Sequence, residues 1–232
     1  MMMTGLTLGE GVYTIPDASR ILHLEQKKLR RWIKGYWKCV EGVRSPLTAP
    51  LVTEGVWDER GSRALNFCAL IEVRVFAVLR EEGIPLQRIR RAHEELRQRL
   101  KTTHPFARQE IISDGRNILT ALDSVGGEKI LVNLTMSSQI ELGHIVEQFC
   151  HNLDFGRKTQ IAERYWPLGK DRSVVVDPHH SFGRPTVSGT NICTEVVAAL
   201  ASSGESEQSI SALYGIPIAT VRDAVDFEAK AA

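Results

Sequence analysis

Positive charge is concentrated near the start of the chain, in the stretch EQKKLRRWIKGYWK at residues 25–38. It holds six lysines and arginines in fourteen residues, although the formal net charge of all 232 residues is only +1. Like charges on one helix face repel each other, so such a face favours a polyanionic partner. Four of the cations follow the i, i+3, i+4, i+7 spacing of a single helix face: Lys27, Arg30, Arg31 and Lys34.

Arginine can form two parallel hydrogen bonds to guanine, whereas lysine acts as a point charge on phosphate. We therefore expect Arg30 or Arg31 to read bases and the lysines to contact phosphates; the alternative is a solvated helix face. Arginines further along the chain could contact phosphates or form surface salt bridges. The DNA-binding residues expected from the sequence are Lys27, Lys28, Arg30, Arg31, Lys34, Arg44, Arg60 and Arg63.

Two short helices must position this cationic face. Apolar residues at i, i+3 and i+4 predict a first helix from Pro16 to about Leu22, with proline at a favoured first position. A second helix is predicted from about Glu25 to Ile33, and Gly35 ends it. Its apolar face lies opposite the cations. Two short helices joined by a tight turn are typical of a helix-turn-helix.

The elements that follow read as a hairpin and two further helices. Residues 45–67 combine prolines and glycines with short apolar runs, which indicates a β-hairpin. The next helices break at Gly83-Ile84-Pro85. The second has an apolar stripe that consists of Ile89, Ala92, Leu96 and Leu100.

No chemistry is indicated between His104 and about Leu168, which predicts a structural segment or a surface for another protein. Residues 109–122 and 128–134 predict short strands around glycine turns. An amphipathic helix capped by Ser137 should follow.

The last part of the chain predicts a strand, a turn and a second strand, then three short helices. We expect Thr194 to cap the first helix. The apolar residues expected inside are Val196, Val197, Leu200, Ile210, Leu213, Ile218, Val221 and Val225. Residues 205–228 contain one basic and five acidic side chains. Phosphates repel such a stretch, which favours protein contact there over direct DNA reading.

Catalytic and metal sites are not indicated. The four cysteines are far apart and read as reduced thiols. His179 and His180 beside Asp177 would point to opposite faces of a strand, so they suit no shared metal. No nucleophile elbow, phosphate loop or paired-carboxylate motif is present. We expect no enzyme, no cofactor and no metal. The chain has neither an apolar run of membrane-spanning length nor a secretion signal, and it should be cytoplasmic.

The N-terminal motifs resemble the winged-helix domain of MerR-type transcription regulators. The resemblance rests on YTIPDASRILHLEQKKLRRWI, SRALNF and LIEVRVFAVLREEGIPLQRIRRA, and covers residues 11–101. In that family the second helix enters the major groove and the wing touches phosphates. The resemblance therefore implies these roles for the cations above. The helix after Gly83 is shorter than the family's dimerising coiled coil, which speaks against metal or drug sensing.

The C-terminal motifs resemble VapB-type antitoxins. DPHHSFGRPTVSGTNI is similar to that family's hairpin, and GESEQSISALYGIPIATVRDAVDFE follows it. The resemblance implies an antitoxin of a type II toxin–antitoxin pair that binds operator DNA to regulate its own transcription and neutralises a PIN-domain ribonuclease. Expected dimer or toxin contacts are Gly183, Arg184, Pro185, Val187, Thr190, Val221 and Arg222.

Together these features predict an α+β, mainly helical homodimer. Residues 1–103 form the winged-helix DNA-binding domain, 104–168 an α/β connector and 169–232 the antitoxin C-terminal domain. Two recognition helices should then reach major grooves about 34 Å apart. Two alternatives remain: a stand-alone MerR-like regulator without a toxin, and an adaptor that binds proteins only.

Overall fold

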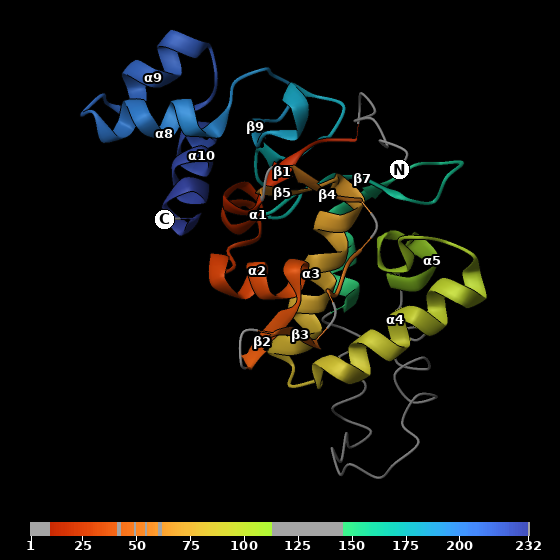
Figure 1. Ribbon diagram of the computed structural model, residues 1–232. Helices are drawn as coiled ribbons and strands as arrows, with labels where there is room; N and C mark the ends of the chain where they lie inside the picture. Colours follow the sequence, from red (N-terminus) through yellow and green to blue (C-terminus); the bar gives the residue numbers. More distant parts are fainter. Residues whose placement is uncertain are drawn as a thin grey trace. The chain divides into compact units, whose positions relative to one another are not determined.

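The computed structural model consists of two compact units, each built from separate segments of the chain (Figure 1). Unit 1 comprises Met1–Arg30, Trp57–Phe67 and Glu163–Ala232, and unit 2 comprises Arg31–Val56 and Cys68–Ala162. Helices predominate over short antiparallel strand pairs, so the expected α+β, mainly helical class is confirmed. The structure describes residues 10–40, 43–48, 50–53, 55–59, 62–112 and 146–231.

The N-terminal part of unit 1 combines a helix pair with a small sheet. Strand β1 pairs with β5 in antiparallel register, Tyr13 opposite Leu65, and β5 also pairs with β4. The Phe67 N–H donates to the Glu10 carbonyl at 2.9 Å, which ties the end of the hairpin to the start of the described chain. The elements are β1 (Tyr13–Thr14), α1 (Ile15–Leu22), α2 (Gln26–Lys34), β4 (Val56–Glu59) and β5 (Ser62–Leu65). The last turn of α2, from Arg31, and the first residue of β4 belong to unit 2.

The C-terminal part of unit 1 begins with strands and ends with three helices. The expected hairpin is confirmed, because β8 and β9 pair in antiparallel register with Val174 opposite Val187. Backbone hydrogen bonds of 2.8 and 3.0 Å also join Tyr165 to Val176. The elements are β7 (Ala162–Tyr165), β8 (Val174–Val175), the 3₁₀ helix η2 (Ser181–Gly183), β9 (Thr186–Val187), α8 (Thr194–Ser202), α9 (Glu207–Tyr214) and α10 (Ile218–Ala231).

An apolar core holds these three helices on the hairpin. Its buried members are Val187, Val197, Ile210, Ile216, Val221 and Ala224. Helix α1 packs against α10, where the His23 and Phe227 rings lie 5.5 Å apart. The first and last described helices of the chain therefore share one compact unit.

Unit 2 is organised around α3, whose apolar residues are buried almost all round. The expected break between helices is confirmed: Gly83 has φ +81°, and the Ile84 N–H donates to the Leu79 carbonyl at 3.1 Å. Residues 146–151 are also helical. The elements are β2 (Tyr36–Val40), β3 (Val43–Thr48), α3 (Phe67–Glu81), α4 (Leu86–Leu100), η1 (Pro105–Ala107), α5 (Gln109–Ile112) and β6 (Leu153–Phe155).

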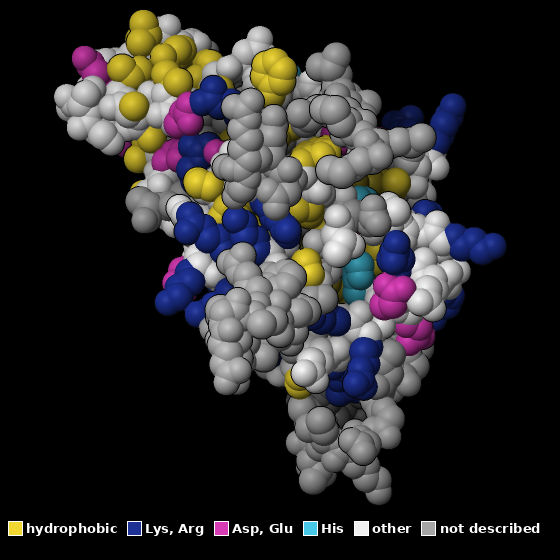
Figure 2. All heavy atoms as spheres, viewed as in Figure 1, with side chains coloured by type: hydrophobic (Ala, Val, Ile, Leu, Met, Phe, Trp, Pro, Cys, Tyr) yellow, Lys and Arg dark blue, Asp and Glu magenta, His cyan; other side chains and the backbone are white. Residues whose placement is uncertain are grey.

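Four local predictions were wrong. Residues Gln109–Ile112 are helical rather than extended. Thr194 is the first residue of α8 rather than its cap, and its buried hydroxyl donates to Glu228 and lies 3.4 Å from the Pro185 carbonyl. The two histidines, 179 and 180, lie in a turn, not a strand. Val196 and Leu213 are exposed at 42% and 68%, and Figure 2 shows hydrophobic side chains over α8 and α9. Ser137 and residues 128–134 lie outside the described residues.

Candidate DNA interface

Helix α1 begins at a complete capping box. The Thr14 side chain accepts a hydrogen bond from the Asp17 N–H, and the Asp17 carboxylate accepts from the Thr14 N–H at 2.9 Å. These bonds satisfy two backbone donors that the first turn would otherwise leave open. Asp17 also places negative charge at the positive end of the helix dipole. The start of the helix pair is therefore fixed locally.

The turn between α1 and α2 is equally well defined. His23 ends α1 in the left-handed region at φ +52°, and the Leu24 N–H donates to the Ser19 carbonyl at 3.1 Å. The Ser19 hydroxyl donates to the Leu24 carbonyl, and the Leu24 side chain is buried. The turn is thus fixed both by a backbone hydrogen bond and by the burial of an apolar side chain.

Helix α2 has one buried apolar side and one cationic side, as its sequence predicted. Leu29, Trp32 and Ile33 are buried. Gly35 follows the helix at φ +75°, and its N–H donates to the Arg31 carbonyl at 3.0 Å. Because the apolar side is fixed in the fold, the opposite side must face outward.

We call the outward cations of α2 the basic face: Lys27, Arg30 and Arg31 are exposed, and Lys28 and Lys34 are half-buried. Lys28, Arg31 and Lys34 each have an interaction partner in the chain. Figure 2 shows lysine and arginine side chains gathered over the region of α1 and α2. This face is confined to one helix and lacks acidic residues.

The three arginines expected on the hairpin have different positions. Arg63 is half-buried on β5 and also has an interaction partner. Arg44 belongs to β3, but its side chain lies outside the described residues, as does the whole of Arg60. Of the expected DNA-binding side chains, the described ones are therefore those of α2 and Arg63.

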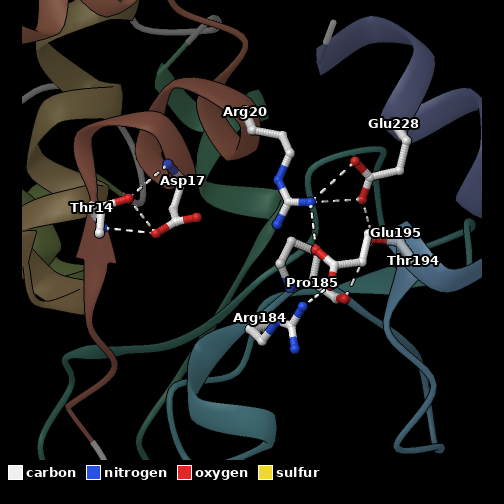
Figure 3. Close-up of polar contacts among 8 residues, drawn as sticks. All are labelled: Thr14, Asp17, Arg20, Arg184, Pro185, Thr194, Glu195 and Glu228. Carbon is white, nitrogen blue, oxygen red and sulfur yellow. Dashed lines mark hydrogen bonds and ion pairs between the residues drawn. The ribbon is translucent and has the colours of Figure 1, made fainter. Parts of the chain in front are cut away.

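The acidic residues of the C-terminal helices are largely paired within unit 1. Arg20 reaches from α1 to Glu195 on α8 at 3.1 Å and to Glu228 on α10 at 3.3 Å (Figure 3). Asp226 and Asp223 bond Arg172, and these two carboxylates raise the pKa of its guanidinium. Arg222 pairs with Glu207 at 2.8 Å. Arg20 therefore neutralises acidic residues of the C-terminal helices, although it lies only a few residues before the basic face in the sequence.

Some of the residues expected to form the dimer or toxin contact are buried, and others are exposed. Gly183, Pro185, Val187 and Val221 lie inside unit 1, and Thr190 is half-buried. Arg184 and Arg222 are exposed and carry ion pairs, Arg184 with Glu195. Val187 and Val221 belong to the apolar core, where a partner cannot reach them, whereas Arg184 and Arg222 are accessible.

Unit 2 contains a buried carboxylate that the sequence reasoning missed. Glu72 is fully buried on α3 and accepts hydrogen bonds from His93 Nε2 at 2.8 Å, His104 Nδ1 at 3.2 Å and the Phe106 N–H at 3.3 Å. Burial by itself raises the pKa of this carboxyl, but the charge of His93 and the two histidine hydrogen bonds hold the pKa below its ordinary value.

A hollow of about 200 Å³ lies beside this buried carboxylate. Leu51, Val52, Arg90, His93 and Arg97 are among the residues that line it. Within the described part of the chain, no group of three His, Cys, Asp or Glu side chains could hold a metal ion. None of the described helices has both the length and the apolar character needed to cross a bilayer.

The two short helices and their tight turn define a helix-turn-helix, with the basic face on its second helix. Residues 11–93 match the family described as "Putative DNA-binding HTH domain", and residues 174–227 match a "Protein of unknown function (DUF433)". The helix-turn-helix expected from the sequence is therefore confirmed.

Two proteins of Mycobacterium tuberculosis (strain ATCC 25618 / H37Rv) are similar to nearly the whole chain. "Putative antitoxin VapB45" is 27% identical over 223 residues, covering 93% of this chain and 92% of that protein. "Uncharacterized protein Rv2308" is 26% identical over 235 residues, covering 96% and 92%. The resemblance to VapB-type antitoxins is thereby confirmed. The crystal structure of Rv2018 from Mycobacterium tuberculosis shares the fold, with a TM-score of 0.71 at 24% identity over 97% of this chain and 100% of that one.

Proposed function

We propose that this protein is a non-enzymatic antitoxin that binds operator DNA as a homodimer and neutralises a PIN-domain ribonuclease toxin. In this function, the α2 helix enters the major groove. Arg30 and Arg31 contact bases, while Lys27, Lys28 and Lys34 contact phosphates. Arg44, Arg60 and Arg63 contribute phosphate contacts from the hairpin region. The protein also represses transcription of its own operon.

The observation that carries this proposal is the basic face itself. Among the described residues, Lys27 and Arg30 form no ion pair, and both are exposed on a helix whose opposite side is buried. Neighbouring like charges on such a helix destabilise it slightly in isolation, and a phosphate backbone removes that repulsion. The match to a family of DNA-binding helix-turn-helix domains supports the same role.

The test for DNA binding is a titration of the purified chain with a duplex from the region upstream of its own reading frame. A duplex of the same composition in scrambled order is the control. We expect tighter binding to the upstream duplex, by about 10³-fold or more. Equal binding to both duplexes would contradict operator recognition.

The toxin part of the proposal is supported by the similarity to a protein named as an antitoxin. Its test is co-expression with the adjacent reading frame. We expect that frame alone to arrest growth, and this chain to restore growth and to co-purify with its product. Growth arrest that persists despite stable expression of this chain would contradict neutralisation and favour a stand-alone regulator.

A further inference from the structure

An aromatic side chain projects from a strained turn in unit 1. Phe182 is 81% exposed, although a phenyl ring is among the side chains that gain most from burial. It lies at φ +57°, between Ser181 at φ +47° and Gly183 at φ +82°. Non-glycine residues rarely adopt this region, and two in succession persist only where the surroundings enforce them. The turn therefore holds Phe182 outward against its own preference.

Several contacts enforce that conformation. The Gly183 N–H donates to the His180 carbonyl at 2.9 Å, and the Arg184 N–H donates to the Ser181 carbonyl at 3.1 Å. The His180 ring bonds the Thr190 carbonyl at 2.9 Å, across the hairpin. Gly183 lies so close to Tyr13 that a Cβ atom would come within 2.2 Å of the Tyr13 hydroxyl. The turn is thus fixed before any partner binds.

A hollow of about 230 Å³ lies directly beside the projecting ring. Its lining includes the apolar residues Val12, Tyr13, Ile21 and Pro185, with Phe182 itself at the edge. A cavity of about 150 Å³ already accepts benzene, so this hollow can hold a phenyl ring. Val12 is 43% exposed at the rim, which leaves the hollow open to the surface.

Each charged side chain that lines the hollow has a bonding partner within unit 1. Arg20 and Arg184 both bond the carboxylate of Glu195, and Figure 3 shows the two arginines on either side of it. Asp17 is bonded within the α1 capping box. A guanidinium near an aromatic face is attractive, so an inserted ring gains from these arginines.

From this geometry we infer that Phe182 of each copy inserts into the hollow of a second copy of this chain. A two-fold dimer brings one surface patch against itself, so it needs a projection and a complementary recess side by side. Phe182 and its neighbouring hollow meet this requirement, and the two arginines at the hollow are already paired with a carboxylate. The Phe182 ring of the second copy thus fills the hollow of the first. The inference rests on the homodimer in the proposed function and assigns its contact.

Sedimentation equilibrium of the full chain without DNA tests this contact. Phe182→Gly deletes the ring and suits the left-handed backbone, so the turn should persist. Because a central aromatic anchor is lost twice per dimer, we expect the dissociation constant to rise by at least about 30-fold. Val12→Trp fills the hollow from its rim and should weaken the dimer similarly. Leu213→Ala, at a comparably exposed apolar residue on α9, should leave it unchanged.

Mixing the two variants gives a stricter test. The Phe182→Gly copy retains its hollow and the Val12→Trp copy retains its ring, so a mixed dimer has one of its two insertions. We expect the mixture to dimerise more tightly than either variant alone. No gain on mixing, an unaltered Phe182→Gly dimer, or a monomeric wild type would each overturn the inference. So would a Phe182→Gly variant that stays dimeric but no longer binds the adjacent frame's product.

The outcome is separable from that of the proposed function. Arg30→Ala should weaken DNA binding and remain dimeric. A wild-type dimer that uses Phe182 but does not bind its upstream duplex would contradict the DNA-binding function and leave the dimer contact standing.

Discussion

Arg20 on α1 and Glu228 on α10 form an ion pair at 3.3 Å, although 208 residues separate them in the chain. Their side chains are 23% and 13% exposed, so the pair is largely removed from solvent. Glu228 also accepts a hydrogen bond from the Thr194 hydroxyl. The pair therefore fixes the first helix of the helix-turn-helix to the C-terminal helices. Helix α2 begins four residues after α1 ends, so the position of its first turn depends on where this contact holds α1.

The Arg20–Glu228 pair should make a measurable contribution to the stability of unit 1. We expect Arg20→Met and Glu228→Gln each to lower the free energy of unfolding by about 1–3 kcal/mol. Arg20→Met leaves the Glu228 carboxylate without its cation, and Glu228→Gln removes one of the two carboxylates that Arg20 binds. A double-mutant cycle by chemical denaturation should give a coupling of at least about 0.5 kcal/mol. Arg222→Met is the control, since its pair with Glu207 is mostly exposed and should contribute less than about 1 kcal/mol. Additive effects at Arg20 and Glu228 would show that the pair is not coupled.

Two glycines with similar backbones should respond differently to alanine. Gly189 has φ +75° with no atom within 4 Å of an added Cβ, so Gly189→Ala should cost only the backbone penalty of about 1–2 kcal/mol. Gly183 has φ +82° and would also collide with Tyr13. Gly183→Ala should therefore lower the thermal midpoint clearly more than Gly189→Ala. Equal shifts in calorimetry would refute the close approach of Gly183 to Tyr13.

Acid stability should report on Glu72. Its pKa in the folded state is below the ordinary value of 4.5, so its contribution is complete above pH 4.5 and is lost as the pH falls through the lower folded value. We expect Glu72→Gln to lower the free energy of unfolding at pH 7 by about 3 kcal/mol, because it removes the charge that His93 and His104 face. Urea titrations should also show a shallower pH dependence below 4.5 for this variant than for the wild type. An identical slope would assign the acid sensitivity to other groups.

Salt dependence should separate phosphate contacts from base contacts. Lys27 is expected to contact a phosphate, so Lys27→Ala should reduce the slope of log K against log salt concentration by about 0.9 per contact. Because a dimer loses two such contacts, the expected reduction is about 1.8. Fluorescence anisotropy over a range of salt concentrations measures this slope. An unchanged slope would remove Lys27 from the interface.

Local patterns were sufficient to predict the helix-turn-helix. Apolar spacing identified α1 and α2 to within a residue or two, and Gly35 and the Gly83-Ile84-Pro85 break marked helix ends correctly. The apolar spacing and the helix-ending residues act within one or two helical turns, so they can be recognised in a single sequence. The cationic side of α2 followed from the same spacing.

Long-range contacts were not predictable in the same way. Arg20 reads as one more cation near α2, and only the folded chain shows that it neutralises Glu195 and Glu228. His93 and His104 follow Glu72 by 21 and 32 residues in the sequence, and no sequence motif links the three. Leu213 fits an apolar helix pattern, yet α9 turns it outward. In each case tertiary packing decides the role of the residue, so sequence periodicity alone cannot predict that role.

The most direct test of the central claim compares two arginine variants in binding to the upstream duplex. Arg30 lies on the basic face, whereas Arg157 is exposed elsewhere, and replacement by alanine changes the total charge equally. We predict that Arg30→Ala weakens binding by about 1–3 kcal/mol per subunit, while Arg157→Ala has little effect. Circular dichroism should show both variants folded. Wild-type affinity in folded Arg30→Ala, or equal losses in the two variants, would contradict DNA recognition by α2.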